Sequence, residues 1–205
     1  MNFSTASGLG RAVALTLATA TVSLTASFTV APAAKSQSVT LNGAGASFPA
    51  PLYNRYFDEF RKETGIQVNY QSIGSGGGIR QFTAGTVDFG ASDDFMSAAE
   101  IARVEGSGVL QIPTAGGSVA IAYNIPGVAD RQLRLSRAVF PAIFTGEITR
   151  WNDPRIAAGN RGVNLPDAPI RVVVRADSSG TSAIFSSALA AVSPSFKGRV
   201  GVSKT

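Results

Sequence analysis

Residues 175–182 have the sequence RADSSGTS and join two segments of different periodicity. Before them, residues 170–174 (IRVVV) are β-branched and apolar, which predicts a buried strand. After them, residues 183–191 (AIFSSALAA) predict a helix. The N–H groups at a helix start are unpaired and carry partial positive charge, Gly180 allows close approach of the backbone, and Arg175 adds a forked cation. The joint therefore suits a tetrahedral oxyanion, although an ordinary capped turn has the same composition.

Two earlier joints have the same chemistry. Residues 45–48 follow a predicted strand at 39–41, while residues 74–78 follow the alternating, strand-like segment 66–72 and lead into a short helix at 79–84. Each joint places a serine and a glycine at the start of a helix. In open α/β sheets, ligands bind just beyond the carboxyl ends of the strands. Three such joints favour an anion site over a simple capped turn.

The first predicted helix follows the joint at 45–48. Prolines at positions 49 and 51 fit its first turn, where a missing N–H does no harm, and Gly65 ends it. Its apolar residues recur at helical spacing and are expected to be core. They are Leu52, Tyr53, Tyr56, Phe57 and Phe60.

Further strands alternate with helices, which indicates an α/β sheet with helices on its faces. Ser97 and Glu100 form a capping box before a helix that runs to about Glu105. Ser136 is expected to cap a helix over residues 137–144. The further strands are predicted at residues 87–92, 109–114 and 119–123.

The composition excludes several kinds of site. The 205 residues include no Cys and no His, which rules out disulfides, thiolate nucleophiles, a Ser-His-Asp hydrolase site and a His-ligated zinc site. There are 18 Lys and Arg against 13 acidic residues, for a formal net charge of +5. Because the basic residues are scattered singly along the sequence, they predict a solvated surface rather than a nucleic-acid interface.

Residues 1–34 have the layout of a secretory signal peptide. Arg11 is their only charged residue, residues 12–30 are mostly apolar, and residues 31–34 (APAA) add small side chains. A membrane-spanning helix is the alternative, but threonines and serines interrupt the apolar run. The absence of a following cysteine argues against a lipid-modified anchor. We therefore expect an exported, soluble protein.

Five motifs stand out along the chain: residues 43–53 (GAGASFPAPLY), 70–78 (YQSIGSGGG), 87–93 (VDFGASD), 143–153 (IFTGEITRWND) and 175–182 (RADSSGTS). Together they resemble the family of periplasmic phosphate-binding proteins, the substrate-binding components of bacterial ATP-binding-cassette phosphate importers. The motifs occur in the order of that family and extend over about residues 40–205.

The resemblance implies an α/β, two-lobed periplasmic-binding-protein fold of the type II-like kind, with mixed sheets. The signal peptide would span residues 1–34, the first lobe residues 35–115 and the second lobe residues 116–205. Gly116-Gly117 is the expected hinge or boundary. Family members continue well past the position of residue 205, so the second lobe and the return to the first lobe are expected to be incomplete.

The resemblance also implies which residues contact phosphate. Asp93 would accept a hydrogen bond from the ligand, and Asp177 would hold Arg175 in place. Position 47 is often Thr in the family, and Ser keeps its hydroxyl. Hydroxyl, backbone and guanidinium donors would come from Ser47, Phe48, Ser75, Arg175, Ser179, Gly180 and Thr181.

The expected role of Asp93 also has a physical basis. A site made of N–H, O–H and Arg donors cannot separate phosphate from sulfate, because both are tetrahedral oxyanions. Phosphate at neutral pH keeps a proton that a buried carboxylate accepts, whereas sulfate presents only lone pairs and like charge. Asp93 is therefore the predicted specificity residue. A helix cap beside Asp94 or Ser97 is the alternative role.

The predicted function is non-enzymatic. We expect a monomeric periplasmic protein that binds inorganic phosphate and delivers it to the importer's permease subunits, with no cofactor, no metal, no catalytic residue and no nucleic acid. A secreted phosphatase is one alternative, although its nucleophile would be a serine without a His base. An extracellular adhesion or matrix protein of the same fold is another. Trp151 is expected to pack rather than to stack on a ligand.

Overall fold

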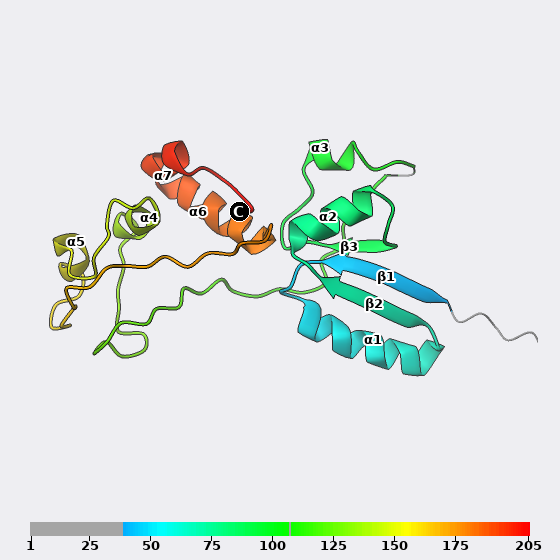
Figure 1. Ribbon diagram of the computed structural model, residues 1–205, viewed down its shortest axis with the longest axis horizontal. Helices are drawn as coiled ribbons and strands as arrows, with labels where there is room; N and C mark the ends of the chain where they lie inside the picture. The colour runs from blue at the N-terminus through cyan, green and yellow to red at the C-terminus, as the bar shows by residue number, and fades with distance from the viewer. Residues whose placement is uncertain (1–38, 107) are drawn as a thin grey trace, which may run out of the picture. The chain divides into compact units, whose positions relative to one another are not determined.

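The computed structural model describes residues 39–106 and 108–205 (Figure 1). The predicted signal peptide at residues 1–34 lies outside these ranges. Among the residues described, no helix is both long enough and apolar enough to cross a membrane. The predicted division into lobes at residues 35–115 and 116–205 stays a prediction.

A three-stranded parallel sheet forms the first part of the fold. Its strands are β1 (Thr40–Gly45), β2 (Gln67–Ser72) and β3 (Phe89–Ala91), in the order β2-β1-β3. Gly45 pairs with both Ser72 and Ala91 in register, so all three strands end at the same edge. The chain leaves this edge towards Ser47, Ser75 and Asp93, as the joints in the sequence predict.

Helices α1 (Ala50–Thr64) and α2 (Ser75–Thr83) connect these strands. Crossovers between parallel strands are right-handed, and β2 and β3 lie on opposite sides of β1, so the two helices cover opposite faces of the sheet (Figure 1). Pro51 lies in the first turn of α1, and Gly65 ends that helix with a left-handed φ of 75°, both as predicted. The second helix begins at Ser75, four residues before the predicted start.

Four aromatic rings pack between α1 and the sheet. Tyr53 and Phe57 of α1 contact Tyr70 of β2 with ring centroids 5.3 and 6.4 Å apart, and Phe57 also contacts Phe89 of β3. The prediction that the apolar residues of this helix are core is correct for Tyr53 and Phe57. The same prediction is wrong for Leu52, Tyr56 and Phe60, which remain exposed.

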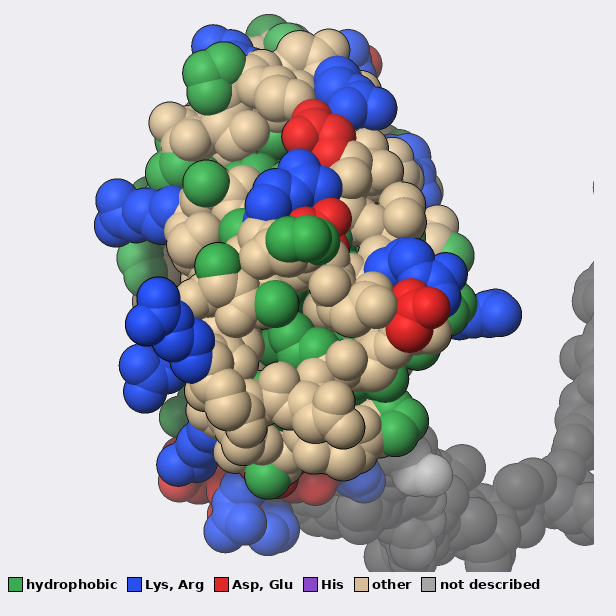
Figure 2. Space-filling view, turned by 90° about the vertical axis from the view of Figure 1, so that its left-hand side faces the viewer, with side chains coloured by type: hydrophobic (Ala, Val, Ile, Leu, Met, Phe, Trp, Pro, Cys, Tyr) green, Lys and Arg blue, Asp and Glu red, His purple; other side chains and the backbone are tan. Residues whose placement is uncertain are grey.

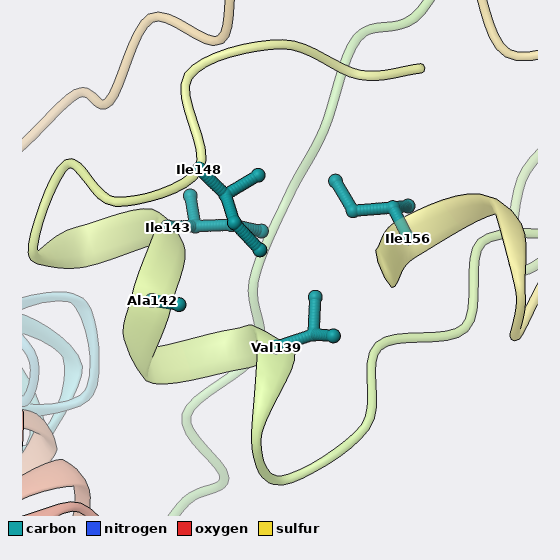
Figure 3. Close-up of a cluster of buried hydrophobic side chains, with 5 residues drawn as sticks. All are labelled: Val139, Ala142, Ile143, Ile148 and Ile156. Carbon is teal, nitrogen blue, oxygen red and sulfur yellow. The ribbon is translucent and has the colours of Figure 1, made fainter. Parts of the chain in front are cut away.

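Five short or medium helices follow the sheet. A second core forms between α4 (Val139–Phe144), the turn after it and α5 (Pro154–Ala157), and its buried side chains point toward one another in Figure 3. Trp151 packs against this cluster, as predicted. The cluster consists of Val139, Ala142, Ile143, Ile148 and Ile156. The helices are α3 (Ala98–Ile101), α4 (Val139–Phe144), α5 (Pro154–Ala157), α6 (Gly180–Val192) and α7 (Pro194–Arg199).

Aromatic contacts join α4 to α6. The ring of Phe185 in α6 contacts Phe140 and Phe144 of α4, with centroids 5.8 and 4.9 Å apart. On the face shown in Figure 2, basic side chains are spread among acidic and hydrophobic ones, in keeping with their scattered positions in the sequence.

Three predicted strands are absent from the described residues. Residues 109–114, 119–123 and 170–174 make no sheet ladder, and Val173 is 90% exposed, so the prediction of a buried strand before residue 175 is wrong. The physical reason is that a strand needs a neighbour to pair its backbone groups, and β-branched composition does not supply one. An isolated bridge from Arg150 to Pro169 lies next to the last of these segments.

Several helix ends differ from their predicted positions. The helix after the capping box ends at Ile101 rather than near Glu105. Helix α4 begins at Val139, and Ser136 accepts a hydrogen bond from the Val139 N–H at 3.3 Å in the turn before it. Helix α7 was not predicted, although Ser193 followed by a proline is a helix-start signal.

Candidate functional site

A carboxylate lies against the start of α6 at the carboxyl edge of the sheet. Asp93 Oδ2 accepts hydrogen bonds from the Thr181 hydroxyl at 2.6 Å and from the Thr181 N–H at 3.1 Å. The Asp93 N–H in turn donates to Ser75 Oγ at 3.2 Å. These contacts join residues that are 88 positions apart in the sequence. Three predicted site residues therefore meet directly.

The start of α6 is buried and capped. Ser179 is 1% exposed, and its Oγ accepts from the Ser182 N–H at 3.3 Å. A Cβ added at Gly180 would lie 2.5 Å from Ser75 Oγ and 3.0 Å from Asp93 Cβ. Only a residue without a side chain lets the helix approach this closely. Ser179 and Gly180 therefore join the group formed by Ser75, Asp93 and Thr181.

The start of α2 meets the loop that precedes α6. The Gly76 N–H donates to Ser178 O at 2.9 Å, and Ser75 is 1% exposed. A Cβ at Gly76 would lie 2.0 Å from Ser178 Oγ, and one at Gly74 would lie 2.4 Å from Asp177 Oδ2. Gly74 and Gly76 thus leave room for the segment that precedes α6. The positive ends of two helix dipoles face the same small region.

Arg175 is held by Asp177, as predicted. Its Nε donates to Asp177 Oδ1 at 2.6 Å, and one Nη donates to Asp177 Oδ2. The guanidinium lowers the pKa of Asp177 through these hydrogen bonds. In return, Asp177, and to a smaller degree the charge of Asp93, raise the pKa of Arg175. Two of the five donors of Arg175 serve Asp177, which leaves others to face a ligand.

Two buried hydroxyl groups have unused donor capacity. Within residues 39–106 and 108–205, Ser75 Oγ and Ser179 Oγ act only as acceptors, so their O–H groups remain able to donate. Asp93 Oδ1 likewise makes no hydrogen bond within these ranges, because both bonds from Thr181 go to Oδ2. The site therefore offers free hydroxyl donors beside a free carboxylate oxygen.

Residues 45–48 lie at the same edge of the sheet, but they make fewer contacts with the group around Asp93. The Ala46 N–H donates to Ala91 O at 2.9 Å, and Ala46 O accepts from the Tyr70 hydroxyl at 2.7 Å. Burial raises the pKa of Tyr70, so this phenol stays protonated as a donor. No hydrogen bond joins Ser47 or Phe48 to Asp93 or Thr181 in the described chain.

Phe48 also makes a contact through its ring. The residue is 49% exposed, and its ring lies 2.7 Å from the position of a Cβ at Gly117, within the predicted hinge. The backbone N–H groups of Ser47 and Phe48 come just before α1. Their predicted contact with phosphate stays a prediction.

The alternative role of Asp93 as a cap of α3 is wrong. Ser97 caps that helix, and Glu100 completes the capping box. The sequence did not show that Thr181 already uses two donors on Asp93, since no local signal links them. It also did not show that the carbonyl of Lys204 accepts from the Ser179 N–H at 2.7 Å. In the residues described, no group of three or more acidic, His or Cys side chains is placed to hold a metal ion.

The family model described as a PBP superfamily domain matches residues 30–205. The phosphate-binding protein PstS of Pasteurella multocida is 47% identical over 169 residues, which are 82% of this chain and 48% of that protein. PstS of Xylella fastidiosa is 42% identical over 181 residues, which are 88% of this chain and 49% of that protein. The chain thus spans about half the length of these relatives.

A solved structure from Clostridium perfringens, with bound phosphate, aligns with 69% of this chain and 52% of its own, at 24% identity and a TM-score of 0.48. The family model covers most of the chain, including every residue of the group around Asp93. The match agrees with the α/β periplasmic-binding-protein fold expected from the five motifs. The chain belongs to the family of the PBP superfamily domain.

Proposed function

We propose that this protein binds inorganic phosphate and delivers it to the permease of an ATP-binding-cassette importer. The observation that carries the proposal is the free donor capacity of Ser75 and Ser179, two buried hydroxyls beside the starts of α2 and α6. Helix starts and hydroxyl donors suit an oxyanion. Arg175 adds a full positive charge, held by Asp177.

Asp93 supports a protonated anion as the ligand. Its Oδ2 is engaged by Thr181, and Oδ1 is the oxygen that would accept the phosphate proton. A fully ionised anion would meet that oxygen with a lone pair. The Thr181 donors either stay on Asp93 and fix its orientation, or turn to the ligand when it binds.

The relatives point in the same direction, since two that cover most of this chain are named phosphate-binding proteins. We propose the same binding role for this chain. It would act as a non-enzymatic, monomeric carrier in the periplasm, exported by the peptide at residues 1–34. Closure of lobes 35–115 and 116–205 over the ligand, with Ser47 and Phe48 among the donors, belongs to the same proposal.

Equilibrium binding of labelled phosphate, with sulfate as competitor, tests this function. We expect saturable binding of phosphate that excess sulfate does not displace, and no hydrolysis of a phosphomonoester in a parallel assay. Turnover without added metal would favour the phosphatase instead. Absence of both binding and turnover would favour the adhesion or matrix role.

Replacing Ser179 by Ala separates its capping role from its proposed donor role. Loss of the cap of α6 is expected to lower the free energy of unfolding by about 1 kcal/mol. The matched control is Ser193→Ala, because Ser193 caps α7 through a hydrogen bond from the Phe196 N–H at 3.1 Å. Urea unfolding should show similar losses for both variants, whereas phosphate affinity should fall only for Ser179→Ala. Equal affinities would contradict a donor role for Ser179.

Arg175→Lys is expected to weaken phosphate binding by roughly tenfold or more, because an ammonium cannot hold Asp177 in a fork and still present planar donors to the anion. Calorimetric titration measures the change. Arg171→Lys, in the same exposed segment, is the control and should bind like the wild type. A normal affinity in the Arg175→Lys variant would remove Arg175 from the site.

A further inference from the structure

Glu100 and Lys204 form a partly buried ion pair. Lys204 Nζ donates to Glu100 Oε1 at 3.0 Å, and the side chains of Lys204 and Glu100 are 22% and 25% exposed, respectively. Each of the other ion pairs in the described residues has at least one side chain more than 40% exposed. A partly buried pair is screened less by salt than pairs on the exposed surface.

Glu100 is held in position from its own helix. Its Oε2 accepts from the Ser97 N–H at 2.7 Å and from the Ser97 hydroxyl at 2.8 Å, which leaves Oε1 for Lys204. These bonds, together with Lys204, lower the pKa of Glu100 to about 2. Ionised Glu100 therefore stabilises the folded state at any pH above its ordinary pKa, and this stabilisation is lost as the pH falls from there towards 2. The ion pair is intact at neutral and mildly acidic pH.

Lys204 is also tied to α6 through its backbone. Its carbonyl accepts from the N–H of Ser179, the cap of α6, at 2.7 Å. The preceding residue, Ser203, donates its N–H to Ser186 Oγ at 3.0 Å and accepts from that hydroxyl at 3.1 Å. One residue thus contacts α3 with its side chain and the start of α6 with its main chain.

We propose that Lys204 is a positioning residue that holds the start of α6 in place through Glu100. This inference rests on the proposed phosphate site, since the two residues after Ser179 are Gly180 and Thr181, which touch Ser75 and Asp93. Lys204 is not proposed to touch the ligand. It sets where the donors of α6 lie relative to Asp93.

Two variants break the pair from opposite sides. Lys204→Met keeps most of the stem and removes the charge. Glu100→Gln removes the partner charge yet keeps the capping box, which accepts Gln as well as Glu. Each single variant is expected to raise the dissociation constant for phosphate roughly five- to tenfold, and the double variant no further, because both changes remove the same interaction.

Hydrogen exchange of the ligand-free protein gives a readout that needs no phosphate. The amides of residues 179–182 should exchange faster in both single variants, while those of α7 stay unchanged. Lys204→Arg should restore slow exchange, because it restores the ion pair. Lys62→Met is the control: it breaks the exposed ion pair between Lys62 and Glu59 in α1, and exchange at residues 179–182 should stay slow.

The outcomes separate the two proposals. If the wild type binds no phosphate, the proposed function fails, while the exchange comparison still decides the positioning role. If the wild type binds phosphate but both single variants match it in affinity and in exchange at residues 179–182, the positioning role is overturned. Additive losses in the double variant, without rescue by Lys204→Arg, would also overturn it.

Discussion

Asp93→Asn is expected to abolish the preference for phosphate over sulfate, a loss of up to roughly 10^4-fold in discrimination. The amide has the shape of the carboxyl group, so it can still accept one bond from Thr181. With its oxygen facing Thr181, the amide presents an N–H₂ donor where Oδ1 now lies, and the negative charge that repels sulfate is gone. Competition of sulfate against labelled phosphate measures the change.

Asp94→Asn is the matched control, because the neighbouring side chain makes no hydrogen bond in the described chain. Its N–H donates to Ser92 Oγ at 3.2 Å through the backbone alone, which the substitution leaves intact. We expect wild-type discrimination from this variant. If sulfate competes as poorly against the Asp93→Asn variant as against the wild type, Asp93 is not the specificity residue.

Gly78→Ala is expected to be strongly destabilising, because α2 packs directly on the backbone of the sheet at this position. The added Cβ would lie 2.4 Å from Gly45 Cα, 2.5 Å from Ala44 O and 3.0 Å from Ala91 O. All three are backbone atoms of the sheet, so no side chain can turn away. Overpacking of this kind costs about 3 kcal/mol or more, a large share of the net stability of a small protein.

Urea unfolding should therefore show a marked fall in midpoint for Gly78→Ala, with loss of phosphate binding because Ser75 moves with α2. Gly198→Ala is the control. Gly198 lies inside α7, a Cβ there meets nothing within 4 Å, and Ala favours a helix by up to about 1 kcal/mol. Equal stability of the Gly78→Ala variant and the wild type would show that α2 can shift away from β1.

Local signals account for the parts of the fold that could be predicted. Pro51 and Gly65 bound α1, and Ser97 with Glu100 caps α3, because each signal acts within a few residues. The pairing of Arg175 with Asp177 is equally local. The joints at residues 45–48 and 74–78 lie at one edge because the parallel strands β1 and β2 end together, which alternation of strands and helices already implies. Residues 175–182 follow no strand and reach this edge through contacts such as that of Thr181 with Asp93.

The parts that could not be predicted depend on distant partners. Residues 170–174 have strand composition, yet Val173 is exposed because no neighbouring strand pairs with it in the described residues. Nothing near Asp93 indicates that Thr181 donates to it, and nothing near Lys204 indicates Glu100. In each case the sequence shows which kind of interaction a residue can make, but it does not show which distant residue is the partner.

The three glycines that open α2 have a consequence for the order of folding. Each disfavours a helix by about 1 kcal/mol relative to Ala, so Gly76, Gly77 and Gly78 cannot hold the first turn by their own preference. Tertiary contact makes up for this, including the bond from Gly76 to Ser178 about a hundred residues further along. We therefore expect the group formed by Ser75, Asp93 and Thr181 to assemble late, after residues 175–182 have docked on α2.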